Sequence, residues 1–253
     1  MNINIKSFFY GLAFSLLLAV FSQYLSLYFG ALFFGLEKSP ISPILVALLL
    51  GILLGNQFDI QSRSSSGLQF CMKQVLRFGI ILMGIRLSLV EIINYGLKSL
   101  IVVVPCIIIT IIVAKIISDR FGLNSRVSSL IAVGTSICGA SAIVAYAPTI
   151  SAKKNEVVFA VANITLFGIV AMLLYPIIAN FLFAKDSISV GIFLGASIHE
   201  TAQVVGAGMM YSQQYSQSEV LEVSTLTKLV RNTAMVFIIP YMAYHNNSQS
   251  SGN

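Results

Sequence analysis

Long apolar runs separated by short polar connectors dominate the pattern of hydrophobic and polar positions along this chain. A helix needs about 20 apolar residues to cross the hydrocarbon core of a bilayer. Eight such segments follow one another, at residues 7–29, 40–58, 68–89, 96–117, 127–150, 157–183, 187–210 and 223–244. The pattern therefore predicts an all-α, polytopic membrane protein with about eight membrane segments.

The connectors between these segments are short and polar. The Ser-rich stretch 62–67 predicts a flexible connector, and Phe121-Gly-Leu-Asn124 predicts a turn followed by a helix N-cap. The first apolar run follows Lys6 but is too long for the core of a signal peptide, so we expect a retained helix. We interpret residues 1–245 as a single transmembrane domain and 246–253 as a disordered polar tail.

The composition supports a membrane protein. The chain is 57% hydrophobic and 9% charged, whereas soluble domains carry about 25% charged residues. The net charge of +6 is not gathered into a basic patch, so no nucleic-acid partner is expected. Cys71, Cys106 and Cys138 lack CxxC spacing and lie in apolar runs, which predicts packing residues and neither a metal site nor a cofactor. Lys and Arg divide evenly between alternate loops, so the sequence gives no membrane orientation.

The fifth apolar segment contains an unusual run of small and polar residues. Positions 134–142 read Gly134-Thr-Ser-Ile-Cys-Gly-Ala-Ser-Ala142, which places hydroxyl groups and glycines at the centre of a span. A lipid-facing helix has no use for these residues at that depth. Interrupted helices of this kind form substrate and ion sites in secondary transporters. The pattern favours an interrupted helix, with close packing through small residues as the alternative.

The seventh segment carries His199 and Glu200 in its middle and no other charge over residues 187–210. Ionisable groups at that depth are rare and by default mark an ion or substrate path, although a buried histidine and a structural ion pair are the alternative. Gln203 stands where a zinc-protease motif needs its second histidine, so that metal site lacks a ligand. A nucleophile pair of Cys138 and His199 has little support, and no catalytic residues are expected.

Basic residues also fall inside the predicted spans. Arg77 interrupts the third span, and Lys228 and Arg231 share one face of the last. Lys228 can instead extend to the lipid headgroups, whereas Arg77 and Arg231 are the better candidates for interior charges. Glu200 is their only obvious carboxylate partner, so the interior is expected to be net positive and to favour an anion. A break at 134–139 would add helix N-terminal N–H groups, which bind anionic oxygens.

Four stretches, at 76–87, 134–142, 195–205 and 228–231, resemble the YeiH-type bacterial inner-membrane proteins, whose members are often labelled sulfate exporters. The resemblance runs from about residue 29 to residue 231. The family is grouped with cation:proton antiporters and bile-acid transporters, which implies inverted repeats with crossing broken helices, 134–142 being one of them. Family members continue with further spans, so the resemblance implies an incomplete second repeat here. The chain would then complete its core as a homo-oligomer or would not work alone.

Together these observations lead to a hypothesis of a proton-coupled secondary transporter in the inner cell membrane that carries a small anion. The resemblance alone suggests sulfate or a related sulfur oxyanion. The expected roles are as follows: Thr135, Ser136, Cys138 and Gly139 line the site, Arg77 and Arg231 balance the charge, His199 or Glu200 carries the proton, and Gly134, Ser141, Gln203 and Lys228 support them. The alternatives are a cation:proton exchanger, in which Glu200 binds Na⁺ or H⁺, and a non-transporting membrane subunit.

Overall fold

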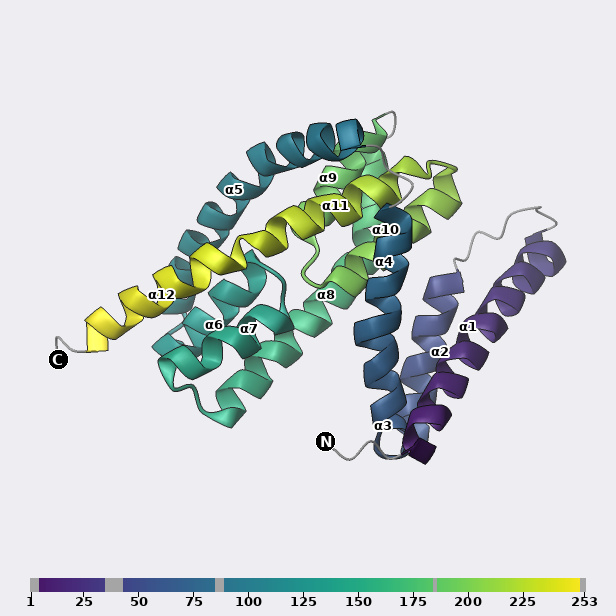
Figure 1. Cartoon of the computed structure of the whole chain (residues 1–253), viewed down its shortest axis with the longest axis horizontal. Coiled ribbons are helices and arrows are strands. Elements are labelled where there is room, and N and C mark those ends of the chain that lie inside the picture. The colour runs from purple at the N-terminus through teal and green to yellow at the C-terminus, as the bar shows by residue number, and fades with distance from the viewer. Residues whose placement is uncertain (1–4, 35–42, 85–88, 184–185, 251–253) are drawn as a thin grey trace. The chain divides into compact units, whose positions relative to one another are not determined.

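The structure, a computed structural model, describes residues 5–34, 43–84, 89–183 and 186–250, and every regular element in these ranges is a helix (Figure 1). The helices are α1 (Ile5–Phe34), α2 (Pro43–Gln57), α3 (Ile60–Phe70), the π-helical turn η1 (Cys71–Val75), α4 (Leu76–Gly84), α5 (Leu89–Arg120), α6 (Ser125–Ser136), α7 (Ala140–Tyr146), the 3₁₀ turn η2 (Ala147–Ile150), α8 (Lys154–Phe183), α9 (Ser187–Ser197), α10 (Thr201–Tyr215), α11 (Glu219–Thr233) and α12 (Met235–Ser250).

Three helices among the described residues are long and apolar enough to cross a bilayer. They cover Ile5–Tyr28 in α1, Leu89–Ser118 in α5 and Lys154–Phe183 in α8. Shorter apolar helices lie at Pro43–Gln57, Ala140–Ile150 and Ser187–Ser197. The prediction of an all-α, polytopic membrane protein is confirmed. The shorter helices at Ala140–Ile150 and Ser187–Ser197 arise where the fifth and seventh predicted spans are divided in two.

The helices form two compact units, which are described separately. One unit comprises Met1–Arg86 with Met210–Ser216, and the other comprises Leu87–Met209 with Gln217–Asn253. The interpretation of residues 1–245 as one transmembrane domain stays a prediction.

Close packing of α1 against α3 organises the first unit. A methyl group on Gly67 would lie 2.2 Å from the carbonyl oxygen of Phe8, and one on Gly11 would lie 2.5 Å from that of Ser64. The backbone N–H of Ser66 donates to the hydroxyl of Ser7 (3.4 Å). The expectation of a flexible connector at 62–67 is wrong, because these small residues belong to α3 and let two helix backbones approach each other.

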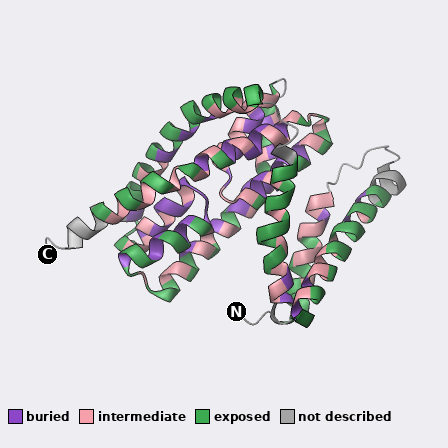
Figure 2. Cartoon of the chain, in the orientation of Figure 1, coloured by how far each residue is buried: buried purple, intermediate pink, exposed green. Residues whose placement is uncertain are grey.

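The second unit is built around the middle of the chain, and its buried residues concentrate in α6, α7, α9, α10 and α11 (Figure 2). One hydrophobic cluster includes Leu130, Ile137, Ile143 and Tyr146, all fully buried. Helix α12 packs on this cluster, and the hydroxyl of Tyr146 donates to the carbonyl of Met242 (3.3 Å). Helix α12 continues to Ser250, residues 251–253 lie outside the described residues, and the expected disorder of 246–253 stays a prediction.

Polar side chains cap two helices of this unit. Asn124 accepts from the N–H of Arg126 (3.0 Å), which confirms the predicted N-cap of α6. Asp186 caps α9 by accepting from the hydroxyl of Ser189 (2.6 Å) and from the N–H groups of Ile188 and Ser189. These hydrogen bonds, that of the Ser189 hydroxyl foremost, hold the pKa of Asp186 below its usual value.

Candidate functional site at two helix breaks

The first helix break separates α6 from α7 and lies within the stretch singled out in the sequence (Figure 1). Helix α6 ends at Ser136 and α7 begins at Ala140. Between them Gly139 adopts φ 71° and ψ −129°, a conformation that side chains with a Cβ rarely adopt. The N–H of Gly139 turns back to the carbonyl of Gly134 (2.9 Å). The predicted interruption is therefore confirmed.

The second break separates α9 from α10 and contains His199 and Glu200. Ile198 leaves the helix in an extended conformation, with φ −77° and ψ 140°. The two breaks touch each other. A methyl group on Gly139 would lie 3.0 Å from Cγ of Glu200 and 3.6 Å from Cβ of His199. Two ionisable side chains are thus placed directly against the first break.

Lys228, on α11, lies behind both breaks and is fully buried. Its Nζ donates to the carbonyl oxygens of Ile137 (2.9 Å) and Ile198 (3.0 Å), one from each break. The side chain therefore does not extend toward lipid headgroups, which was the alternative drawn from the sequence. It joins the ends of two helices that are about 60 residues apart in the chain.

Arg231 lies one turn further along α11 and is 4% exposed. Its Nη1 donates to the carbonyls of Ala196 (2.7 Å) and Ile198 (3.1 Å). Its Nε donates to the carbonyl of Ser136 (2.9 Å), and its Nη2 to that of Thr135. These contacts use four of the five N–H groups of a guanidinium, so one N–H remains without a partner among the described residues.

Lys228 and Arg231 bind backbone carbonyl groups that the two breaks leave without partners. The last carbonyl groups of a helix have no intrahelical partners, and the C-terminal end of a helix carries partial negative charge. At α6 and α9 these ends are buried, and Lys228 and Arg231 supply both the donors and the positive charge. Neither cation forms an ion pair in the described part of the chain. The local charge is net positive, with Glu200 as the nearby carboxylate.

A closed set of hydrogen bonds fixes Glu200 against α8. The hydroxyl of Thr165 donates to Oε1 of Glu200 (3.1 Å), and the N–H of Glu200 donates to Oε1 of Gln203 (3.3 Å). Nε2 of Gln203 donates back to the carbonyl of Thr165 (3.3 Å). A methyl group on Gly168 would lie 2.1 Å from Oε1 of Gln203, so only glycine leaves room for the amide. The carboxylate of Glu200 is held in position and remains half-exposed.

A cavity of about 670 Å³ opens beside the breaks, between α5, α6, α8 and α9. Its polar lining includes Thr135, Asn163, Ser197, His199 and Arg231. The remaining walls are mostly apolar, from α5, α8 and α9. Nδ1 of His199 is buried and has no hydrogen-bond partner among the described residues. The cavity is therefore lined by a hydroxyl, an arginine and an imidazole whose buried Nδ1 has no partner among the described residues.

The structure brings most of the predicted site residues to one place. Thr135, His199 and Arg231 line the cavity, whereas Ser136, Cys138, Gly139, Glu200, Gln203 and Lys228 surround the breaks behind it. Gly134 packs against Ile164 of α8, where a methyl group would lie 2.3 Å from Cδ1. Ser141 is exposed on α7 and is not among the residues that line the cavity. Arg77 is exposed on α4 and belongs to the other unit, so the site described here does not include it.

Sequence reasoning missed the residues of α5 and α8 that complete the site. Asn163 and Thr165 are polar positions within the apolar span of α8, and that contrast was a usable signal. Ser99 on α5 shares a buried hydrogen bond with Thr227 of α11 (2.7 Å). The apolar cavity walls gave no signal, because lipid-facing and cavity-facing residues of a span have the same character.

The fold and the site define the class of this protein: an all-α polytopic membrane protein with two broken helices in contact. A family model described as conserved hypothetical protein 698 matches residues 10–253. The chain belongs to that family. The chain is 36% identical over 233 residues to UPF0324 membrane protein RA0957 of Rhizobium meliloti, a match covering 90% of this chain and 61% of that protein. It is 32% identical over 257 residues to UPF0324 membrane protein CT0845 of Chlorobaculum tepidum, covering 100% of this chain and 67% of that protein.

These relatives confirm the resemblance found in the sequence and assign the protein to a membrane. A further relative, UPF0324 membrane protein FN0533 of Fusobacterium nucleatum, is 32% identical over 87% of this chain and 62% of its own length. The chain thus spans about three fifths of the length of the first relatives it matches. No solved structure matches this fold.

Proposed function

We propose that the protein is a secondary transporter of the inner cell membrane whose substrate site is the cavity at the two helix breaks. The observation that supports this most is the contact between the breaks, with Lys228 and Arg231 holding both C-terminal helix ends. Broken helices that meet near the bilayer midplane are the usual site architecture of secondary transporters. Unwound backbone at that depth is tolerated where protein buries it or where it lines a cavity.

The proposed substrate is a small anion. Two cations and one carboxylate surround the breaks, so their net positive charge favours an anion over a cation. Arg231 keeps one free N–H, and Thr135 and His199 line the same cavity. Arginine and hydroxyl donors suit oxyanions, and sulfate or a related sulfur oxyanion is the candidate that the family resemblance adds.

Proton coupling is assigned to His199 or Glu200. His199 lines the cavity, and Glu200 lies half-exposed beside the first break, so both ionisable side chains are placed at the proposed site. Thr165 holds the carboxylate in place through its hydroxyl (3.1 Å). The same carboxylate supports a second candidate function, cation:proton exchange, in which Glu200 binds Na⁺ or H⁺ and the basic residues are structural.

Glu200→Gln separates the two candidates. For the full chain in proteoliposomes, uptake of labelled sulfate should persist in this variant while its dependence on pH is lost. Glu91→Gln, an exposed carboxylate on α5, is the matched control and should keep both properties. Loss of sodium binding without any effect on anion uptake would instead support the exchanger. Failure of the unaltered chain to transport any ion, with a stoichiometric partner co-purifying, would support a non-transporting membrane subunit.

A further inference from the structure

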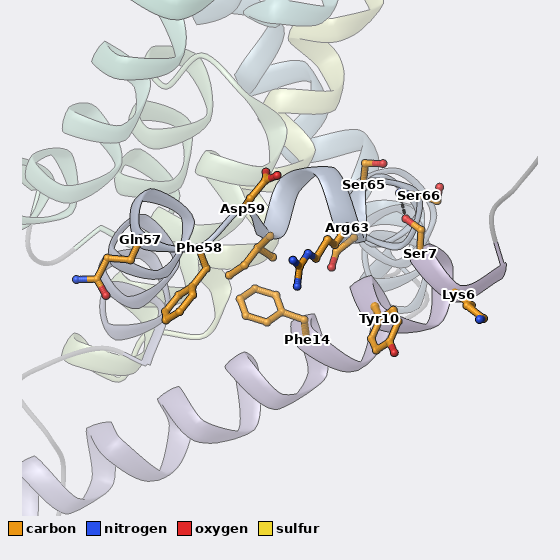
Figure 3. Close-up of a pocket in the computed structure, with 12 residues that line it drawn as sticks. Lys6, Ser7, Tyr10, Phe14, Gln57, Phe58, Asp59, Arg63, Ser65 and Ser66 are labelled. Carbon is orange, nitrogen blue, oxygen red and sulfur yellow. Dashed lines mark hydrogen bonds between the residues drawn. The ribbon is translucent and has the colours of Figure 1, made fainter.

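A second cavity, of about 870 Å³, lies within the first unit (Figure 3). It lies between the first turns of α1 and the turn from α2 to α3. Lys6, Tyr10 and Phe14 line it from α1, and Phe58, Asp59 and Arg63 line it from the other side. Hydroxyl groups of Ser7 and of residues 64–66 complete the wall.

The charges of this cavity are arranged for an anion. The guanidinium of Arg63 points into the cavity beside the ring of Phe14, whereas the carboxylate of Asp59 points away from it (Figure 3). Arg63 and Lys6 are exposed, and neither has a hydrogen-bond or ion-pair partner in the described part of the chain. The lining carries a net charge of +1, from two cations and one carboxylate. An arginine aimed into a cavity without a partner is ready to bind an anionic oxygen.

The position of the cavity suggests which anion it binds. The apolar span of α1 begins at Ile5, so the cavity lies where α1 enters the bilayer. The turn beside it is polar, as expected of a segment at the membrane surface. Tyr10 and Phe9 of α1 are 65% and 62% exposed, which leaves an apolar surface next to the cations. Basic residues and aromatic rings at this depth are the usual contacts of an anionic lipid. The basic residues bind its phosphate, and its acyl chains pack on the apolar surface.

We propose that this cavity binds the headgroup of an anionic phospholipid, with Arg63 and Lys6 on the phosphate and the acyl chains along the exposed face of α1. The site is independent of the proposed transport cavity, because all of its residues belong to the first unit. A soluble phosphate ester would meet the same cations but would leave the aromatic walls unused. A zwitterionic lipid would bind with lower affinity, because its own positive group is repelled by the two cations.

Native mass spectrometry of the full chain, purified in detergent, tests the proposal with three probes: phosphatidylglycerol, phosphatidylcholine and soluble glycerol 1-phosphate. A basic residue near the surface contributes about a fivefold gain in affinity for an anionic lipid, so two contribute about thirtyfold. The Lys6→Gln, Arg63→Gln variant should therefore bind phosphatidylglycerol about thirtyfold more weakly. The matched control, Arg120→Gln with Lys154→Gln, removes two exposed cations of the second unit and should bind within about twofold of the unaltered chain.

Three outcomes would overturn the proposal. Equal losses in the two double variants would mean that general surface charge is responsible. Equal binding of phosphatidylcholine and phosphatidylglycerol would mean that only the apolar walls matter. Glycerol 1-phosphate binding as tightly as the lipid would reassign the cavity to a free phosphate. Retention of phosphatidylglycerol binding by Arg63→Lys, but not by Arg63→Gln, would support charge recognition of the headgroup.

Discussion

Replacing Lys228 by Met tests whether this side chain holds the two helix breaks together. The side chain is fully buried on α11, and its Nζ donates to the carbonyls of Ile137 and Ile198. Methionine fills a similar volume without donors or charge. The substitution therefore removes the hydrogen bonds and the charge while disturbing the packing little.

The substitution does not affect the hydrogen bonding of the two carbonyl acceptors equally. The carbonyl of Ile198 keeps its hydrogen bond from Nη1 of Arg231 (3.1 Å), whereas Ile137, which is fully buried, loses the donor from Lys228. A buried acceptor left without a partner costs about 1–3 kcal/mol, and lost charge at two helix C-termini adds about 0.3–1 kcal/mol each. Since the variant no longer buries a charge, it avoids the cost of desolvating that charge, which offsets part of the lost stability. We expect a net loss of about 2–3 kcal/mol in the free energy of unfolding.

Reversible unfolding of the full chain by SDS in mixed micelles measures this loss. Leu229→Met is the matched control, because it places the same side chain at the next position, where the native leucine is 40% exposed. The control should change the free energy of unfolding by no more than about 0.5 kcal/mol. If Lys228→Met unfolds at the same SDS fraction as Leu229→Met, the ammonium group does not hold the breaks and the reasoning is refuted.

Two further predictions concern packing and pH. Gly195→Ala should destabilise the protein by about 1–3 kcal/mol, because the methyl group would lie 2.4 Å from the carbonyl of Ser224. Gly79→Ala, with nothing within 4 Å, should be neutral or stabilising in the same SDS titration, and equal effects would contradict the packing. Because the folded pKa of Asp186 is lowered, its stabilising contribution is complete above its ordinary value of 3.8 and is lost as pH falls through the folded pKa. Asp186→Asn should keep the cap but lose this acid dependence in thermal unfolding between pH 7 and 3, so an unchanged acid transition would argue against it.

The first break, and the ionisable residues at the second, could be predicted because they interrupt an otherwise apolar pattern. Gly139 and the hydroxyl residues around it stand out in a span that contains no charge, and His199 and Glu200 stand out in another. Such residues are costly in hydrocarbon, so their presence alone indicates a buried site.

The partners of the buried cations could not be predicted. Arg231 and Lys228 were expected to meet an anion or lipid headgroups, yet both donate to backbone carbonyls. Which helix end lies beside a side chain depends on how distant segments pack. Every residue has a backbone carbonyl, so residue identity does not indicate which carbonyl accepts the hydrogen bond. The helix α3 was missed for a related reason. Its serines and Gly67 have the composition of a flexible connector. They form a helix that packs closely against Gly11 of α1, and the sequence alone does not show this contact.

Ligand-dependent thermal stability tests the central claim, that the cavity at the two breaks binds an anion. The full chain in detergent is heated with sulfate, sulfite, thiosulfate, chloride or sodium at two pH values. At a hundredfold excess over its dissociation constant, the bound ligand should stabilise the protein by about 2.7 kcal/mol. The account predicts this shift with an oxyanion, its loss in Thr135→Val and His199→Gln, and its retention in Leu229→Met. Stabilisation by sodium alone, or an oxyanion shift that survives both cavity substitutions, would contradict it.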